Sequence, residues 1–537
     1  MRTILAILAV GILIETAFSG CIEHEKKEEV IPLEDLNKYV NPFIGTAGDH
    51  GQLYPGPVRP FGLVRLGPDT VLRNHAGYDY DCDEIKGFNH FRLGGVGCEG
   101  EGGNILVTPS IGSVSSSHYN HDDEEAQPGY YAVSPKDCNI QVELTATQHV
   151  GFHKYTFPAS TKPLIQIDAG STFTNYYEAW ARVDGNNIVE GYALTGNFGG
   201  EDAMYPLYFY TVFSKPFQSY SNEGDGKIVL KFTTFQDEVI MLKVGLSLIS
   251  VEQAQLNLET ELSHWDFEKV KKEAKEDWNR LLNRIVVESE SNEFKTIFYT
   301  ALYRSLLIPI NTTDVNGKYL GFDENIHVAK NHTHYDTYSL WDTFRTKHPL
   351  LTLVYPQMKR DMVVSLTDAY EEGGWMPRWP VMNKYTWGMI GDHATPVIVD
   401  TYIKGITDFD VEKSYEGIKK NAMEPGGIRE ELSDYKDLGY VPMKPDFTME
   451  YAYDDWCLAQ MAKALGKTED YEYFMKRARN YANTWDSDHG LFWYLNGRYD
   501  RVYGFPNGRY RRGFWSWKED PEKMEIDCTE GSLWHWI

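Results

Sequence analysis

The spacing of hydrophobic positions changes about halfway along the chain. From about residue 37 to residue 250, Gly and Pro separate short apolar segments of strand composition. The clearest of these segments are residues 103–108, 130–133, 140–145, 164–168 and 239–244. Many short strands with regular turn signals predict a β-sandwich.

From about residue 260 the apolar positions recur with helical spacing. The charged, amphipathic residues 265–285 predict a connector helix or a pair of helices. Further helices are predicted over residues 294–307, 357–372, 393–404, 411–423, 449–465 and 471–485. The aromatic-rich residues 528–537 carry no helix-stop signal, so we expect the helical domain to be interrupted there.

The N-terminus has the pattern of an export signal. Arg2 supplies a positive charge, and the apolar run 4–14 is too short to span a bilayer. The residues Phe-Ser-Gly-Cys that end at Cys21 resemble a lipobox, which predicts lipidation of Cys21 and anchoring at the cell surface. A plain secretory signal, giving a periplasmic or secreted protein, is the alternative. Residues 22–33 are charged and predict a tether.

Composition narrows the choice of partners. The net charge is −26, and we find no local basic patch, so nucleic acid is not expected to bind. Aromatic residues make up 14% of the chain, which fits either core packing or stacking on sugar rings. Beyond Cys21, Cys82 could pair with Cys98, and the odd number of remaining cysteines leaves at least one free thiol.

Six stretches are too specialised for a generic scaffold. They are residues 40–46 with 54–62, 87–97, 338–345 with 348–351, 373–380, 439–442 with 451–456, and 529–534. Their order and spacing, from about residue 38 to residue 537, resemble glycoside hydrolase family 92, the calcium-dependent, inverting exo-α-mannosidases.

The resemblance implies an α+β multidomain protein with an N-terminal β-sandwich followed by an (α/α)6-type helical barrel, here incomplete. We expect a signal peptide with lipobox (1–21), a tether (22–36), the sandwich (37–255), linker helices (256–288) and a partial catalytic barrel (289–537). The active site is expected between the sandwich and the barrel. Mannose-containing glycans are the expected partners, and a membrane is expected to be reached only through the lipid anchor.

The same resemblance assigns roles to particular residues. Glu530 matches the general acid, with an exposed glutamate at a helix start as the alternative. Trp341 and Asp342 fall where the family grips the terminal mannose, although Asp342 could instead be a helix N-cap. The remaining expected substrate-binding residues are Arg345, then Trp375, Arg378 and Trp379 on an exposed loop, then His90 and Arg92 from the sandwich. For the loop the alternative is structural anchoring, and for His90 a hydrogen-bonded structural role.

One acidic stretch is predicted to lie in solvent and to have no role in the site. Glu450, Asp454 and Asp455 form an acidic helical face, and such faces usually lie in solvent.

The chain departs from the family pattern at three places. His90-Phe91-Arg92 replaces a His-x-His, so one polar contact differs. Ser532 and His535 replace Asn and Gln, whose carbonyl oxygens suit Ca²⁺ better. The family continues beyond this point to a segment that carries the catalytic base. We therefore expect a fragment that holds the acid and lacks the base.

These observations predict a glycoside hydrolase that removes terminal α-linked mannose, with α-1,2 linkages favoured, and that is inactive as the 537-residue chain. The alternative is a carbohydrate-binding or degenerate scaffold lipoprotein without turnover. A glycoside phosphorylase is a third possibility, but the chain shows no basic cluster suited to phosphate.

Overall fold

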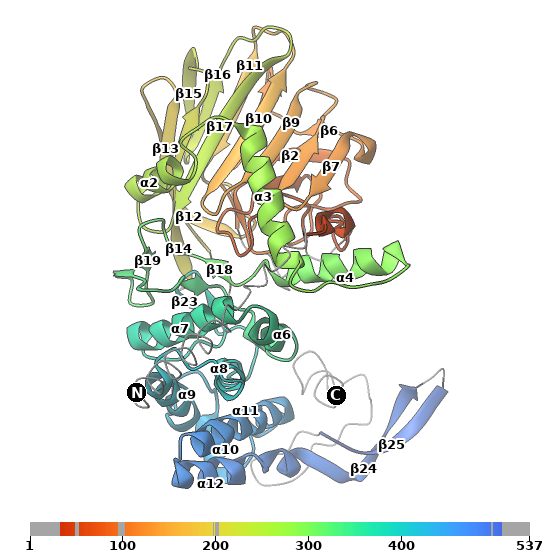
Figure 1. Ribbon diagram of the computed structural model, residues 1–537, viewed down its shortest axis with the longest axis vertical. Helices are drawn as coiled ribbons and strands as arrows, with labels where there is room; N and C mark the ends of the chain where they lie inside the picture. The colour runs from red at the N-terminus through yellow and green to blue at the C-terminus, as the bar shows by residue number, and fades with distance from the viewer. Residues whose placement is uncertain are drawn as a thin grey trace, which may run out of the picture. The chain divides into compact units, whose positions relative to one another are not determined.

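The computed structural model describes residues 33–48, 53–94, 102–196, 198, 203–495 and 498–506. The chain divides into two compact units, Met1–Asp35 and Leu36–Ile537. Almost all of the first unit lies outside the described residues. The elements below belong to the second unit (Figure 1).

Two antiparallel sheets form the N-terminal domain. The first has the order β1 (Gly67–Thr70), β2 (Glu84–Asn89), β5 (Leu106–Ile111), β11 (Pro163–Asp168), β16 (Lys227–Lys231) and β15 (Ser219–Gly224), with β6 (Ser117–His118) beside β2. The second has the order β12 (Asn175–Asp184), β13 (Ile188–Gly196), β14 (Met204–Phe213), β17 (Glu238–Ser247), β10 (Val150–Phe157), β9 (Gln141–Ala146), β8 (Tyr130–Val133) and β7 (Glu124–Gln127). Two short strands, β3 (Phe91–Arg92) and β4 (Gly102–Asn104), pair separately.

Apolar side chains at every second position of the strands fill the core between these sheets. Ile165 and Ile167 of β11 and Ile240 and Leu242 of β17 are all fully buried in one apolar cluster. A strand places every second side chain on the same face, so this spacing of two directs each set inward. The predicted β-sandwich is confirmed. The predicted strand 103–108 is broken at Ile105, where φ is +57° and β4 gives way to β5.

Three helices follow the sandwich: α2 (Val251–Glu261), α3 (Phe267–Leu282) and α4 (Asn292–Ser305). Each begins at a side-chain cap, because Ser250, Asp266 and Ser291 accept hydrogen bonds from backbone N–H groups three residues on. Helix α2 packs on β17 and β14, and α3 packs on β9 (Figure 1). The sequence pattern indicated α3 and α4 but missed α2.

The C-terminal domain is helical. Short paired strands come first: β18 (Ile310–Asn311) with β21 (Tyr335–Asp336), and β19 (Lys318–Leu320) with β20 (Ile326–Val328). The helices that follow are α5 (Leu340–Thr343), α6 (Lys347–Val354), α7 (Pro356–Gly373), α8 (Ala394–Ile403), α9 (Val411–Met423), α10 (Leu432–Leu438), α11 (Pro445–Ala464) and α12 (Thr468–Arg477). The pair β22 (Pro380–Val381) and β23 (Lys384–Tyr385) lies between α7 and α8, and α11 packs on α8, α9 and α12.

Most of the predicted helices of this domain are present at the expected positions. The prediction of a helix over 471–485 is wrong in its second half, because α12 ends at Arg477. A 3-10 turn (Asn480–Thr484) and the hairpin β24 (Trp485–Leu495) and β25 (Arg498–Pro506) follow. Asn and Thr are weak helix formers, and Asn483 donates a 2.9 Å hydrogen bond to the carbonyl of Gly439 instead.

Within the described residues, no helix has both the length and the apolar character that crossing a bilayer requires.

Candidate active site

Glu450 on α11 holds two residues of the predicted mannose-binding segment. Its Oε1 accepts a 3.2 Å hydrogen bond from Nε1 of Trp341 and a 3.3 Å bond from Nη2 of Arg345. The Trp341 side chain is buried, whereas Asp342 and Arg345 remain exposed. The short helix α5 thus presents Asp342 beside an indole that the protein interior has fixed.

The second oxygen of Glu450 belongs to a buried ion cluster. Nε2 of His393 lies 3.2 Å from Oε2 of Glu450, and Nδ1 lies 3.2 Å from Oδ1 of Asp454. The imidazole also stacks on Phe344, with ring centroids 4.0 Å apart. Burial by itself lowers the pKa of His393, but the carboxylates of Asp454 and Glu450 raise that pKa to about 10. His393 is therefore an imidazolium at neutral pH, held between two carboxylates.

A further layer of buried charge supports this cluster. Asp455 accepts hydrogen bonds from Nη1 of Arg429 at 2.7 Å and from Nε of Arg477 at 2.8 Å. Asp392 accepts from Nε of Arg429 at 3.2 Å. The carboxylate of Asp455 and the guanidinium of Arg429 are fully buried, so each needs the other to offset its desolvation.

The prediction of a solvated acidic face on this helix is therefore wrong. Glu450 is 4% exposed, and Asp454 and Asp455 are 0% exposed. Sequence reasoning also missed His393 and Arg429. The sequence of α11 could have indicated this burial, because it has no clearly polar face. A helix without a polar face is expected to be buried together with its carboxylates.

The structure tests the capping interpretation of Asp342. Ser339, not Asp342, occupies the N-cap position of α5. Asp342 lies inside the helix, where its Oδ2 accepts a hydrogen bond from the Ser339 hydroxyl. The capping alternative is therefore wrong, and the carboxylate keeps acceptor capacity toward solvent.

The predicted sugar platform on the loop after α7 is more buried than expected. Trp379 is 4% exposed and packs against Phe198, with ring centroids 6.0 Å apart. Arg378 is 3% exposed and donates to Oε1 of Glu430 at 2.9 Å. These two side chains anchor the loop, which corrects the expectation of an exposed platform. Trp375 is half-buried, and Trp387, which the sequence analysis did not single out, is 45% exposed.

His90 and Arg92 are fully buried inside the sandwich. Nδ1 of His90 lies 2.7 Å from the carbonyl oxygen of Ile105, and its Nε2 lies 2.8 Å from Nε2 of His153. Arg92 donates to the carbonyls of Gly67, Pro68 and Ala76 and pairs with Asp69 at 3.1 Å. Both side chains thus serve the sandwich itself, which corrects the expectation that they reach the substrate.

The expected general acid Glu530, the lipidation residue Cys21 and the expected calcium-side residues Ser532 and His535 lie outside the described residues. Within them, one group of His, Cys, Asp or Glu donors is close enough to hold a metal ion: His332, His334 and Asp368. Its nitrogen donors do not suit Ca²⁺, which takes oxygen ligands. We therefore derive no step through calcium. Cys82 carries a free thiol, and its suggested partner Cys98 lies outside the described residues.

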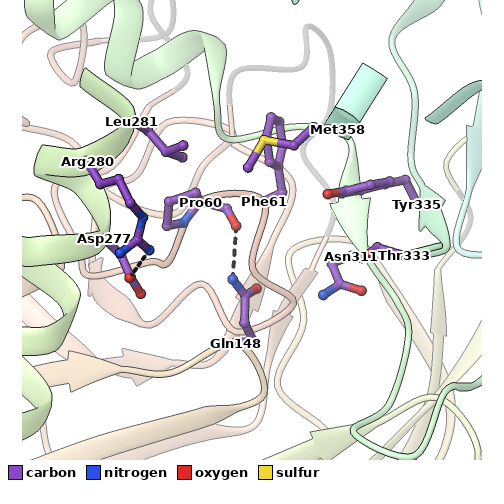
Figure 2. A pocket seen from close by; sticks show the side chains of 10 residues that line it. All are labelled: Pro60, Phe61, Gln148, Asp277, Arg280, Leu281, Asn311, Thr333, Tyr335 and Met358. Carbon is purple, nitrogen blue, oxygen red and sulfur yellow. Dashed lines mark hydrogen bonds and ion pairs between the residues drawn. The ribbon is translucent and has the colours of Figure 1, made fainter. Parts of the chain in front are cut away.

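A cavity of about 220 Å³ opens elsewhere in the same unit. It lies where loop residues Pro60 and Phe61 and Gln148 of the sandwich meet Asp277 of α3 and Met358 of α7 (Figure 2). None of the predicted substrate-binding residues lines it. The cavity is therefore separate from the Trp341–Glu450 cluster.

Several relatives share both sequence and architecture with this chain. The α-mannosidase BT3965 from Bacteroides thetaiotaomicron is 30% identical and superposes with a TM-score of 0.84, covering 94% of this chain and 71% of that protein. A second structure of BT3965 contains mannoimidazole. The inverting mannosidase BT2199 from the same organism is 27% identical, with a TM-score of 0.82 and coverage of 94% and 70%.

A curated relative, described as a secreted glycosidase of Arthroderma benhamiae, is 25% identical over an alignment of 552 positions that covers 90% of this chain. The chain spans 66% of the length of that relative. Residues 39–247 match the glycosyl hydrolase family 92 N-terminal domain, and residues 253–537 match the catalytic domain of the same family. The two matches occupy most of the sequence in the order that the fold requires, and the chain therefore belongs to glycosyl hydrolase family 92.

Proposed function

We propose that this protein is an exo-acting α-mannosidase that removes terminal α-linked mannose from glycans with inversion. The observation that best supports this proposal is the superposition on the α-mannosidase BT3965, which covers 94% of the chain at a TM-score of 0.84. The name of BT2199, an inverting mannosidase, supports the stereochemical part of the proposal.

The geometry around Trp341 supports binding of a terminal sugar. The indole of Trp341 is buried and held by Glu450, and the Arg345 guanidinium lies over its ring, so this side chain fixes the position of α5 beside the proposed sugar. The exposed carboxylate of Asp342 is proposed to accept hydrogen bonds from two sugar hydroxyls, and Arg345 adds donors beside it. These three residues are the proposed grip on the terminal mannose, with Trp375 proposed to contact the next sugar.

The proposed chemistry needs two carboxyl groups on opposite sides of the sugar. In an inverting glycosidase an acid protonates the leaving oxygen while a base activates water, and the two lie about 6.5–9.5 Å apart. We assign the acid to Glu530. Preference for α-1,2 linkages, use of calcium, export, and anchoring through Cys21 complete the proposal.

The test uses protein produced from the complete gene. With α-1,2-mannobiose as substrate, proton NMR should detect β-mannose as the first product. Glu530→Gln should lower kcat by about 10²–10⁴-fold, the usual contribution of a general acid. Asp342→Asn should lower kcat/KM by roughly 10- to 100-fold, because hydrogen bonds to charged groups contribute about 1.5–3 kcal/mol.

Asp408→Asn is the matched control, since Asp408 is an exposed carboxylate paired only at the surface with Arg360. A Glu530→Gln variant with a near-normal rate, or α-mannose as first product, contradicts the assignment. Calorimetric binding of the disaccharide without any turnover would instead favour the carbohydrate-binding alternative.

A further inference from the structure

Two histidines that precede β21 meet an aspartate of α7. Nε2 of His332 lies 2.9 Å from Oδ2 of Asp368, and Nδ1 of His334 lies 3.4 Å from the same oxygen. The three donor atoms all lie within 4.8 Å of one another. None of these residues belongs to the proposed mannose site.

The two imidazoles converge on one carboxylate oxygen, Oδ2 of Asp368. Thr333 and Tyr335, between and beyond them in the chain, instead line the cavity of Figure 2. The segment is tied down on both sides. The N–H of Thr333 donates to Oδ2 of Asp361 at 3.1 Å, and the N–H of Tyr335 donates to the Ser365 hydroxyl at 2.9 Å.

The helix supplies the third donor in register. Asp361, Ser365 and Asp368 recur at the spacing of one α-helical face, so the first two fix the segment and the third faces its imidazoles. The cluster is therefore organised by backbone hydrogen bonds that do not involve its own donor atoms.

One of these donor atoms lacks any hydrogen bond. Nδ1 of His334 is buried without a hydrogen-bond partner, and its side chain is 1% exposed. The ring cannot easily turn away, because it stacks on Tyr319 with centroids 3.7 Å apart and an interplanar angle of 11°. The 3.4 Å contact of Nδ1 with Oδ2 of Asp368 is an ion-pair contact without hydrogen-bond geometry, so a ligand shared by both groups would satisfy this buried nitrogen better.

The other imidazole is oriented as metal-bound histidines are. Nδ1 of His332 lies 3.2 Å from the carbonyl oxygen of Lys330. A ligating histidine typically donates its second ring N–H to a carbonyl or carboxylate, which fixes the ring and leaves the other nitrogen for the metal. A bound metal ion would replace the 2.9 Å hydrogen bond between Nε2 of His332 and Oδ2 of Asp368.

We propose that His332, His334 and Asp368 bind one divalent transition-metal ion, with zinc as the best chemical match. Zn²⁺ takes imidazole nitrogen and carboxylate oxygen at about 2.0–2.2 Å, which places two tetrahedral ligands about 3.4 Å apart. The separations from Asp368 to the two imidazoles, 2.9 and 3.4 Å, are close to this spacing. Water completes the coordination, since Asp368 is 20% exposed.

Glu372, the neighbouring carboxylate on α7, already accepts hydrogen bonds from other groups. Oε1 of Glu372 accepts a 2.6 Å hydrogen bond from the Tyr319 hydroxyl, and its Oε2 accepts from the N–H of Phe322 at 3.1 Å. Glu372 therefore adds negative charge near the site without serving as a ligand. The bound ion would cross-link residues 330–336 to α7. This segment ends a few residues before Trp341 and Asp342.

Cobalt is the probe of choice, because Zn²⁺ has no d-electron absorption whereas tetrahedral Co²⁺ absorbs in the visible. The tag-free chain, stripped with chelator, is titrated with Co²⁺ and then with Zn²⁺. We expect one Co²⁺ per chain with visible bands, displacement by Zn²⁺, and a rise in Tm that chelator reverses. These measurements on the unmodified chain need no variant and no mannosidase activity.

His334→Gln and Asp368→Asn test the ligands. Each should weaken Co²⁺ binding by at least about tenfold, since even loss of an outer-shell partner typically costs that much. His118→Gln is the matched control, because His118 forms an exposed pair with Asp137 at 2.8 Å.

Three results would overturn the proposal: no cobalt bands in the unmodified chain, unchanged affinity in His334→Gln, or an equal loss in His118→Gln.

Discussion

Nε1 of Trp341 donates a 3.2 Å hydrogen bond to Oε1 of Glu450, which lies 109 residues further along the chain. The bond joins the short helix α5 to α11 and shares its acceptor oxygen with Arg345. A single buried carboxylate thus holds the indole and the guanidinium that lies over it, next to the exposed Asp342 in the chain. Glu450 is accordingly a positioning residue for the proposed mannose site.

Loss of Glu450 should weaken substrate binding more than chemistry. In protein from the complete gene, Glu450→Ala should raise the KM for α-1,2-mannobiose roughly tenfold, because a hydrogen bond is worth about 0.5–1.5 kcal/mol and two are lost. Glu450→Gln retains an acceptor for Trp341 and should have a smaller effect. Glu469→Gln, at an exposed position of α12, is the control. Equal KM values for Glu450→Ala and the control would exclude a positioning role.

Asp455 should matter for stability rather than for substrate. Asp455→Asn leaves Arg429 and Arg477 without their shared buried carboxylate, and breaking such a pair costs about 3–5 kcal/mol. Urea denaturation followed by circular dichroism measures this loss. Asp408→Asn removes a surface pair and should cost no more than about 1 kcal/mol. If the two variants were equally stable, the buried network would not stabilise the fold.

The pH dependence of stability should carry the signature of His393. Its pKa is raised from 6.5 to about 10 in the folded chain, so its contribution is fully present below pH 6.5 and is lost as the pH rises through 10. The groups that face it are Glu450 and Asp454, with Phe344 stacked on the ring. The difference in unfolding free energy between the wild type and His393→Gln should therefore shrink between these pH values. A constant difference would show that His393 is neutral when folded.

Gly391 is required by the same cluster. Its φ is +79°, and a Cβ there would lie 2.4 Å from Nε2 of His393. Gly405 has a φ of +92° but no atom within 4 Å of its added Cβ. Gly405→Ala should therefore cost only backbone strain, about 1–2 kcal/mol, and Gly391→Ala should cost distinctly more. Thermal unfolding of the two variants compares them directly. Equal Tm values would show that the His393 side chain moves away from the added Cβ without loss of stability.

Local patterns located most of the secondary structure because they act over a few residues. The period of two in β11 and the helical spacing of α9 depend only on which side chains share a face. Helix α10, with seven residues, is too short to show a period, and the polar α2 lacks an apolar stripe strong enough to stand out. Propensity also failed after Arg477, where tertiary contacts such as that of Asn483 with Gly439 replaced the last helical turns.

The sequence by itself determined the order of sandwich and helical domain, the family, and Trp341 and Asp342 as candidates for the mannose site. Only the tertiary structure decided that Glu450, Asp454 and Asp455 are buried, because the charges that make their burial tolerable, on His393, Arg429 and Arg477, come from separate elements. The same holds for His90 and Arg92, which face carbonyls and an aspartate within the sandwich. A charged side chain belongs to the interior or to solvent according to its partners in space, and a one-dimensional pattern does not contain them.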